Sequence, residues 1–162
     1  MSVSTTIQVV GVKDTINNLR KIDPQLQKDF KTQATLIAQP AIQAGRDVYR
    51  ELPLSGMKYK WTQRDRKLFP FTVTKAANGV KMRFDTRRNA VGVILIEQKD
   101  PAAAIFETAG RANANRLSNS LGFVGPGRTR LIGPAVYKAR RNVEKELKSA
   151  VMDAMRTVQR GF

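Results

Sequence analysis

The 162-residue sequence contains neither cysteine nor histidine. The lack of cysteine excludes disulfide bonds and thiolate nucleophiles, and the lack of both excludes the zinc sites that are built on them. Without imidazole, the acid or base that most often works near neutral pH is missing as well. Paired carboxylates are the catalytic device that is left, and the candidates Asp85, Glu97, Asp100 and Glu107 have no fixed spacing. We therefore expect no enzymatic activity, no metal and no cofactor.

Long apolar runs are missing too. The sequence nowhere has the roughly 18 consecutive apolar residues of a membrane-spanning helix, and residues 1–12 lack the basic start and apolar core of a secretory signal. We expect a soluble protein that is made in the cytoplasm and has no membrane partner. The length suits a single domain, residues 1–162, with protruding segments.

Acidic residues are scarce: 13 stand against 29 basic ones, and the formal net charge is +16. The excess is concentrated between residues 58 and 130, which hold 15 basic and 5 acidic side chains. Such an excess is neutralised by phosphate, by anionic lipid or by an acidic protein surface. The composition therefore indicates a class of partner without naming one.

The chain begins with a strand and a short helix. Residues 5–12 are β-branched and apolar, which predicts a short strand. Asp14 or Thr15 can then cap a helix that ends near Ile22 and has its apolar residues on one face.

Two long helices are predicted further along the chain. Asp23-Pro24 has the pattern of an N-cap followed by proline at the first helical position, and apolar residues then keep a 3.6-residue period to about residue 49. Pro40 removes one backbone hydrogen bond from this helix, so we expect a bend in the preceding turn; a hinge is the alternative. Over residues 134–161 an apolar residue again recurs at every third or fourth position.

The middle of the chain is predicted to form strands. Residues 70–85 hold two β-rich runs on either side of Asn78-Gly79, a pair that accepts positive φ in a tight hairpin turn. Residues 91–96 make a third strand, apolar enough to be covered on both faces. With the helices, these strands predict an α+β fold in which two long helices pack on a small, mostly antiparallel sheet.

The stretch KDPAAAIFETAGR combines alanines with one carboxylate. Asp100-Pro101 can start a short helix, and Gly110 can end it. Glu107 lies four residues before Arg111, so the two can form an ion pair. A pair at the protein surface is the plain structural interpretation, and a pair at a subunit boundary is the functional one.

Two long segments are predicted to be irregular and basic: the first basic segment, residues 53–69, and the second basic segment, residues 111–133. Loops of more than about 15 residues are usually functional or mobile. The candidate partner-binding residues in and beside these segments are Lys58, Lys60, Trp61, Arg64, Arg66, Lys67, Glu107, Arg111, Arg116, Arg128 and Arg130.

Two kinds of partner fit these residues. Cations that alternate with Trp61 and Phe69 can follow a phosphate backbone while the rings stack on bases, which makes nonspecific nucleic-acid binding an alternative. The sequence has no helix-turn-helix, zinc-finger or ribonucleoprotein pattern that would read a base sequence. An acidic protein surface fits equally well, since arginine and aromatic residues are enriched at protein interfaces. On a purely structural interpretation, Trp61 and Phe69 are apolar anchors of a loop.

The order of the predicted elements, with AAAIFETAGR after the central strands, resembles the small neck and tail-completion proteins of long-tailed bacteriophages, the group that includes the lambda tail-completion protein Z. Members often carry a motif like YAxxxEFGT at this place. Phe106, Glu107 and Gly110 match the motif, whereas its tyrosine is missing and Thr108-Ala109 stands where Phe-Gly is usual.

The resemblance implies an α+β fold, a homo-oligomeric ring around the tail axis, contacts with terminator, connector or tail-tube proteins, a place in the virion and no enzymatic activity. Each subunit of a ring must present two complementary surfaces, and long segments that become ordered against a neighbour suit this need. The basic segments would then face an acidic ring or, in passing, packaged DNA. Protein is favoured, because several phosphate contacts would retain DNA that must be released quickly.

Overall fold

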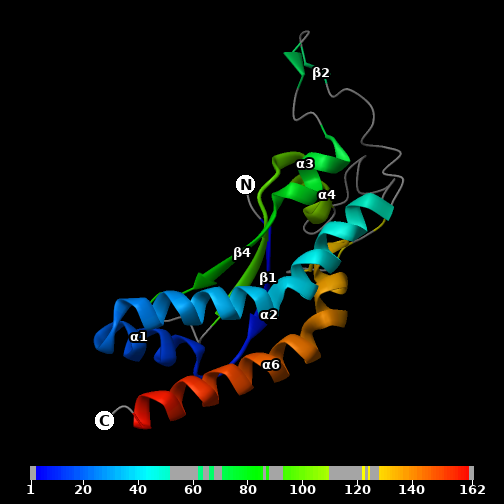
Figure 1. Ribbon diagram of the computed structural model, residues 1–162. Coiled ribbons are helices and arrows are strands. Elements are labelled where there is room, and N and C mark those ends of the chain that lie inside the picture. The colour runs from blue at the N-terminus through cyan, green and yellow to red at the C-terminus, as the bar shows by residue number, and fades with distance from the viewer. Residues whose placement is uncertain are drawn as a thin grey trace.

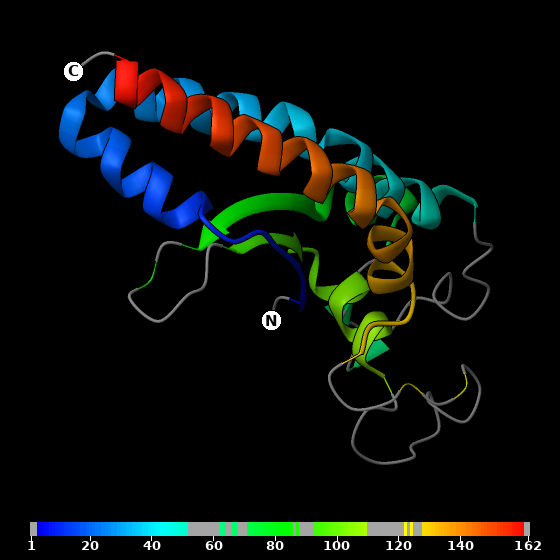
Figure 2. The same cartoon turned by 90° about the horizontal axis from the view of Figure 1, so that it is seen from below.

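The computed structural model describes residues 3–51, 62–63, 66–67, 71–85, 87, 93–109, 122, 124 and 128–160. Their fold is α+β, which confirms the predicted class. Two long helices lie side by side and antiparallel over one face of a three-stranded antiparallel sheet (Figures 1 and 2). None of the helices in these ranges is long and apolar enough to cross a membrane.

The sheet has the strand order β1-β5-β4, and its bounds are β1 Val3–Gln8, β4 Val80–Asp85 and β5 Val93–Gln98. The central strand β5 pairs antiparallel with both neighbours, so that Ile94 lies opposite Ile7 on one side and Phe84 on the other. Residues 94–98 are all buried. The predicted third strand, residues 91–96, is confirmed over its described residues 93–96, and β5 continues two residues further, to Gln98.

Five helices are described: α1 Val12–Ile22, α2 Pro24–Glu51, α3 Val73–Gly79, α4 Pro101–Thr108 and α6 Ile132–Arg160. Helix α6 packs along α2, and α1 contacts both of them (Figure 2). Alanines and one glycine of α2 allow this close packing. A Cβ added at Gly45 would lie 3.2 Å from Cγ1 of Val80 and 3.4 Å from Cγ1 of Ile132, so α2 passes directly over β4 and the start of α6.

Local capping explains where α2 begins. The Oδ1 atom of Asp23 accepts a hydrogen bond from the backbone N–H of Gln25 at 2.8 Å, and Pro24 is the first helical residue, as predicted. The helix continues through Pro40 to Glu51, two residues beyond the predicted end.

The predicted cap of α1 is wrong. Asp14 and Thr15 lie inside its first turn, because the helix already starts at Val12. Gly11, at a φ of 94°, turns the chain from the strand into the helix, and its carbonyl accepts a hydrogen bond from the Thr15 N–H at 2.9 Å. Helix α1 therefore starts at a backbone turn at Gly11 and has no side-chain cap.

The predicted hairpin around Asn78-Gly79 is also wrong. Val73–Gly79 forms helix α3, and only the second run, β4, is a strand, which pairs with β5. The hydroxyl of Thr72 accepts a hydrogen bond from the Lys75 N–H at 3.2 Å and so caps the helix. The Nε2 group of Gln98, on the central strand, donates to the Ala76 carbonyl at 2.8 Å. A cap and a contact from the sheet therefore outweigh the β-propensity of this run.

Gly79 is required for a different reason from the one the hairpin suggested. Positive φ is found at Gly11 and Gly122 among the described glycines, and not at Gly79. A Cβ at Gly79 would overlap Oε1 of Gln98 and lie 2.9 Å from the backbone nitrogen of Asp100. The side chain of Gln98 thus fills the space that any larger residue at this position would need.

The two basic segments lie mostly outside the described residues. Within the first, two short antiparallel strands are described, β2 Thr62–Gln63 and β3 Arg66–Lys67. Within the second, Gly122, Val124 and residues 128–133 are described. Their predicted irregular conformation elsewhere stays a prediction.

Gly79→Ala should lower the free energy of unfolding by about 1–3 kcal/mol, because the added methyl group must displace the buried Gln98 side chain. Asn78→Ala, one residue away and exposed, is the matched control and should change the free energy by less than about 0.5 kcal/mol. Urea denaturation of the two variants measures both values. Equal stability of the two variants would show that Gln98 has room to move.

Candidate assembly interface

Three residues far apart in the sequence come together where α2 and α4 end and α6 begins. They are Tyr49, Glu107 and Arg130, which we call the anchoring cluster. Tyr49 and Glu107 lie in the last turns of the helices that precede the two basic segments, and Arg130 lies within the second segment, two residues before α6.

Helix α4 places Glu107 in the cluster. The Oδ2 atom of Asp100 accepts a hydrogen bond from the Ala103 N–H at 2.9 Å, and Pro101 occupies the first turn, which confirms the predicted start. Residues 102–104 are alanines that are buried beside the sheet. Because small side chains let the helix lie close to the strands, its last turn carries Glu107 into the interior.

Glu107 is fully buried, and its carboxylate accepts three hydrogen bonds. The donors are the Tyr49 hydroxyl at 2.5 Å, the Leu131 N–H at 2.8 Å and the Ile132 N–H at 3.2 Å. The first N–H groups of a helix have no partner within the helix, and the positive end of the helix dipole attracts an anion. Glu107 therefore caps α6 from a different helix.

The prediction that Glu107 forms an ion pair at the surface is wrong, because the side chain has no exposed area and its hydrogen bonds all point inward. Arg111, the expected partner, lies outside the described residues.

Arg130 connects the same two helices with the charges reversed. Its guanidinium donates to the carbonyl of Ala109 at 2.8 Å, to that of Phe106 at 3.3 Å and to that of Gly122 at 3.0 Å, and it lies 5.4 Å from the centre of the Phe106 ring. The carbonyls at a helix end lack partners and form the negative end of the dipole. A cation from the residues just before α6 thus caps α4, while an anion from α4 caps α6.

The cluster brings the end of α2, which precedes the first basic segment, together with the end of α4 and the start of α6, on either side of the second. The backbone N–H of Arg130 donates to the carbonyl of Glu107 and so joins the two ends of the segment between α4 and α6. The Tyr49 hydroxyl donates to the Glu107 side chain and so connects α2, two residues before that helix ends. The described residues that flank the segments consequently lie at one end of the body, where α2, α3 and α4 meet (Figure 1).

Burial sets the ionisation of the cluster. Desolvation raises the pKa of Glu107, and the hydrogen bonds from Leu131, Tyr49, Ile132 and Arg130 oppose this shift. Desolvation also raises the pKa of the Tyr49 hydroxyl, and the charge of Glu107 adds to the effect. Tyr49 therefore stays protonated and keeps donating to the carboxyl group at physiological pH.

The other candidate carboxylates have structural partners. Asp85 forms an ion pair with Arg87, Glu97 contacts Arg83 at 2.8 Å and Lys99 at 3.8 Å, and Asp100 caps α4. Across the described ranges, no group of three acidic side chains is placed to hold a metal ion.

The structure places few of the predicted partner-binding residues. Glu107 and Arg130 meet in the anchoring cluster, and Arg128 lines a surface groove. The backbones of Arg66 and Lys67 form strand β3. The remaining candidates lie outside the described residues; they are Lys58, Lys60, Trp61, Arg64, Arg111 and Arg116.

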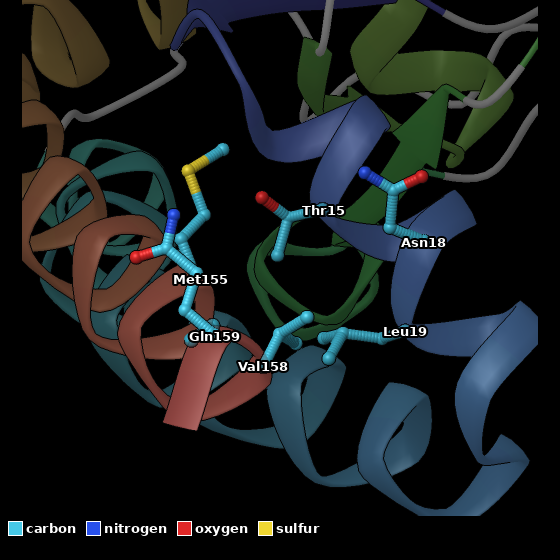
Figure 3. Close-up of a pocket in the computed structure, with 7 residues that line it drawn as sticks. Thr15, Asn18, Leu19, Met155, Val158 and Gln159 are labelled. Atoms are coloured by element: carbon cyan, nitrogen blue, oxygen red, sulfur yellow. The ribbon is translucent and has the colours of Figure 1, made fainter. Parts of the chain in front are cut away.

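Sequence reasoning missed a surface groove and Tyr137, one of the residues that line it. The groove has a volume of about 620 Å³ and lies between β1 and the start of α6; Ser4, Thr5, Arg128, Thr129, Gly133, Pro134, Tyr137 and Lys138 line it. A smaller pocket of about 220 Å³ lies between α1 and the end of α6, where Thr15 and Leu19 approach Met155 and Val158 (Figure 3). The exposed Tyr137 inside an amphipathic helix was the one signal of the groove in the sequence.

No protein-family model, curated protein or solved structure matches the chain. Its function is therefore inferred from its own residues and their arrangement.

Tyr49→Phe should lower the free energy of unfolding by about 1.5–3 kcal/mol, because it removes a hydrogen bond to a buried carboxyl group. The exposed Tyr137 gives a matched control, since Tyr137→Phe removes the same hydroxyl from the surface and should change stability by less than about 0.5 kcal/mol. Chemical denaturation measures both. A neutral Tyr49→Phe variant would mean that the cluster does not hold α2.

Glu107 should make stability depend on pH in a defined direction. Because its pKa is raised above the ordinary value of 4.5, the folded chain binds more protons than the unfolded chain between 4.5 and the raised value. This contribution is fully present below pH 4.5 and is lost as the pH rises through the folded pKa.

Glu107→Gln removes the titrating group, so it isolates this effect. The free energy of unfolding of the natural protein, measured relative to that of Glu107→Gln, should fall as the pH rises across the window. Urea denaturation at several pH values from below 4.5 to neutral gives the difference. A difference that does not change with pH would show that burial does not shift the pKa.

Proposed function

We propose that this protein is a structural component of a long-tailed bacteriophage, a neck or tail-completion subunit that forms a homo-oligomeric ring at the junction of head and tail. It would be made in the host cytoplasm, act in the virion and carry out no catalysis. Its partners would be copies of itself and terminator, connector or tail-tube proteins, with passing contact to packaged DNA.

The observation that carries the proposal is the common origin of the two basic segments. The end of α2, which precedes the first segment, meets the residues on both sides of the second segment at the anchoring cluster, where Glu107 and Arg130 join α4 to the start of α6 and Tyr49 joins α2. A ring subunit needs a rigid body that presents extended contact segments in a defined direction. The cluster supplies the rigid base for such segments.

Charge supports the same function. Residues 58–130 hold 15 basic and 5 acidic side chains, and four of the five acidic ones are engaged inside the folded body or at its helix starts. Because the 15 basic side chains of this region outnumber its 5 acidic ones, the excess of positive charge favours an acidic partner. A protein ring suits this better than DNA, since tight phosphate contacts would slow the release of DNA.

Imaging of purified particles, with this chain labelled and located, tests the proposal directly. We expect the label at the neck, in a ring around the tail axis. A chain that is missing from the particles, or that lies on the packaged genome, would contradict the proposal.

A salt titration separates the proposal from nonspecific nucleic-acid binding. If phosphate contacts dominate, affinity for duplex DNA should be high at low salt and collapse steeply as salt rises. A neck subunit should bind naked DNA only weakly at physiological salt.

Charge reversal in the first basic segment should block assembly. The double variant Arg64→Glu and Arg66→Glu replaces attraction to an acidic neighbour by repulsion, while the folded body keeps its contacts. Particle yield in a phage that lacks the natural chain measures assembly, and circular dichroism checks the fold. The double variant Arg141→Glu and Lys148→Glu makes the same charge change on exposed positions of α6 and should assemble normally. Normal assembly of both variants would show that the first basic segment is not an interface.

A further inference from the structure

Strand β1 is an edge of the three-stranded sheet. Among the described strands its neighbour is β5, and the groove beside the start of α6 lies next to it. An edge strand presents a row of backbone N–H and C=O groups that can pair with an additional strand. Ser4 and Thr5 of β1 line the groove directly, so this row borders an open space of about 620 Å³.

The opposite wall of the groove comes from α6. Gly133 and Pro134 line the groove near the helix start, and Tyr137 and Lys138 follow one turn later. Tyr137 is 70% exposed, which is unusual for a large ring in a helix that packs on a core. Tyrosine suits protein interfaces because its ring covers apolar area while its hydroxyl can form a hydrogen bond.

The groove carries charge of one sign. Lys138 is exposed and Arg128 borders the groove, while none of the lining residues is acidic. An occupant with carboxylates would therefore find a complementary surface.

We propose that the groove takes an extended acidic segment of a neighbouring protein, which adds to β1 as a fourth strand. Backbone hydrogen bonds to β1 supply affinity, the Tyr137 ring packs against a side chain of the added strand, and Lys138 selects an acidic residue. That the neighbour is a virion protein rests on the proposed function, whereas the groove and its chemistry do not.

Strand β1 of a second copy is a poor occupant of this groove, because Val3–Gln8 holds no acidic residue that could meet Lys138. A nucleic acid is poor as well. Phosphate tracking needs a row of cations, and six of the eight lining residues are uncharged. The edge of a sheet, in contrast, matches the backbone of another strand residue by residue.

Three labelled peptides probe the groove of the full-length protein: one that alternates valine or threonine with glutamate, the same peptide with lysine in place of glutamate, and the acidic peptide with alternate residues replaced by proline. Fluorescence anisotropy measures binding. We expect only the first to bind, because lysine reverses the charge and proline cannot pair as a strand. Amide hydrogen exchange over residues 3–8 should slow when the acidic peptide binds, as strand addition requires.

Matched variants place the binding site. Lys138→Glu should weaken binding of the acidic peptide about fivefold, and Tyr137→Ala about tenfold. Lys145→Glu makes the same charge change about 10 Å further along α6, where salt screens most of the interaction, and should alter binding by less than about twofold.

Four results would overturn the inference: no binding of the acidic peptide, equal binding of the basic or proline peptide, displacement by a single-stranded oligonucleotide, or equal effects of Lys138→Glu and Lys145→Glu. These outcomes are independent of the particle experiment. A chain found in the neck that fails to bind the acidic peptide would overturn the groove and leave the proposed function standing. A chain that binds the peptide but is missing from particles would overturn the proposed function alone.

Discussion

Removal of the Glu107 carboxylate from water is the constraint on which the rest of the structure depends. A buried carboxyl group is costly unless donors surround it, and the start of α6 has N–H groups that need an acceptor. The carboxylate and these N–H groups can bond to each other only if α4 ends where α6 begins. The Tyr49 hydroxyl supplies a third donor and thereby sets the position of α2 against both helices.

Arg130 completes this arrangement with the opposite polarity. A cation at the end of α4 and an anion at the start of α6 compensate both helix dipoles at one junction. The junction also sets the direction in which α6 crosses the sheet, and so it places Tyr137 and Lys138 beside the edge of β1. The anchoring cluster and the groove are thus two consequences of the same helix start.

The division of charge follows from the same packing. Carboxylates of the middle region cap helices or pair with cations beside the sheet, as Asp100 and Glu97 do. The two basic segments hold nine cations and one acidic residue, Asp65. A region whose cations outnumber its carboxylates is suited to binding an acidic partner.

The sequence alone determined the features that depend on near neighbours in the chain. The periods of the two long helices, the Asp23-Pro24 and Asp100-Pro101 starts and the apolar central strand were all predictable, because capping and periodicity act within a few residues. Tertiary structure decided what lies between distant residues. Gln98 holds residues 73–79 as a helix across 22 positions, and Tyr49 reaches Glu107 across 58. The spacing of residues in the sequence does not reveal such contacts, because distant residues become buried together and form hydrogen bonds only when the chain folds.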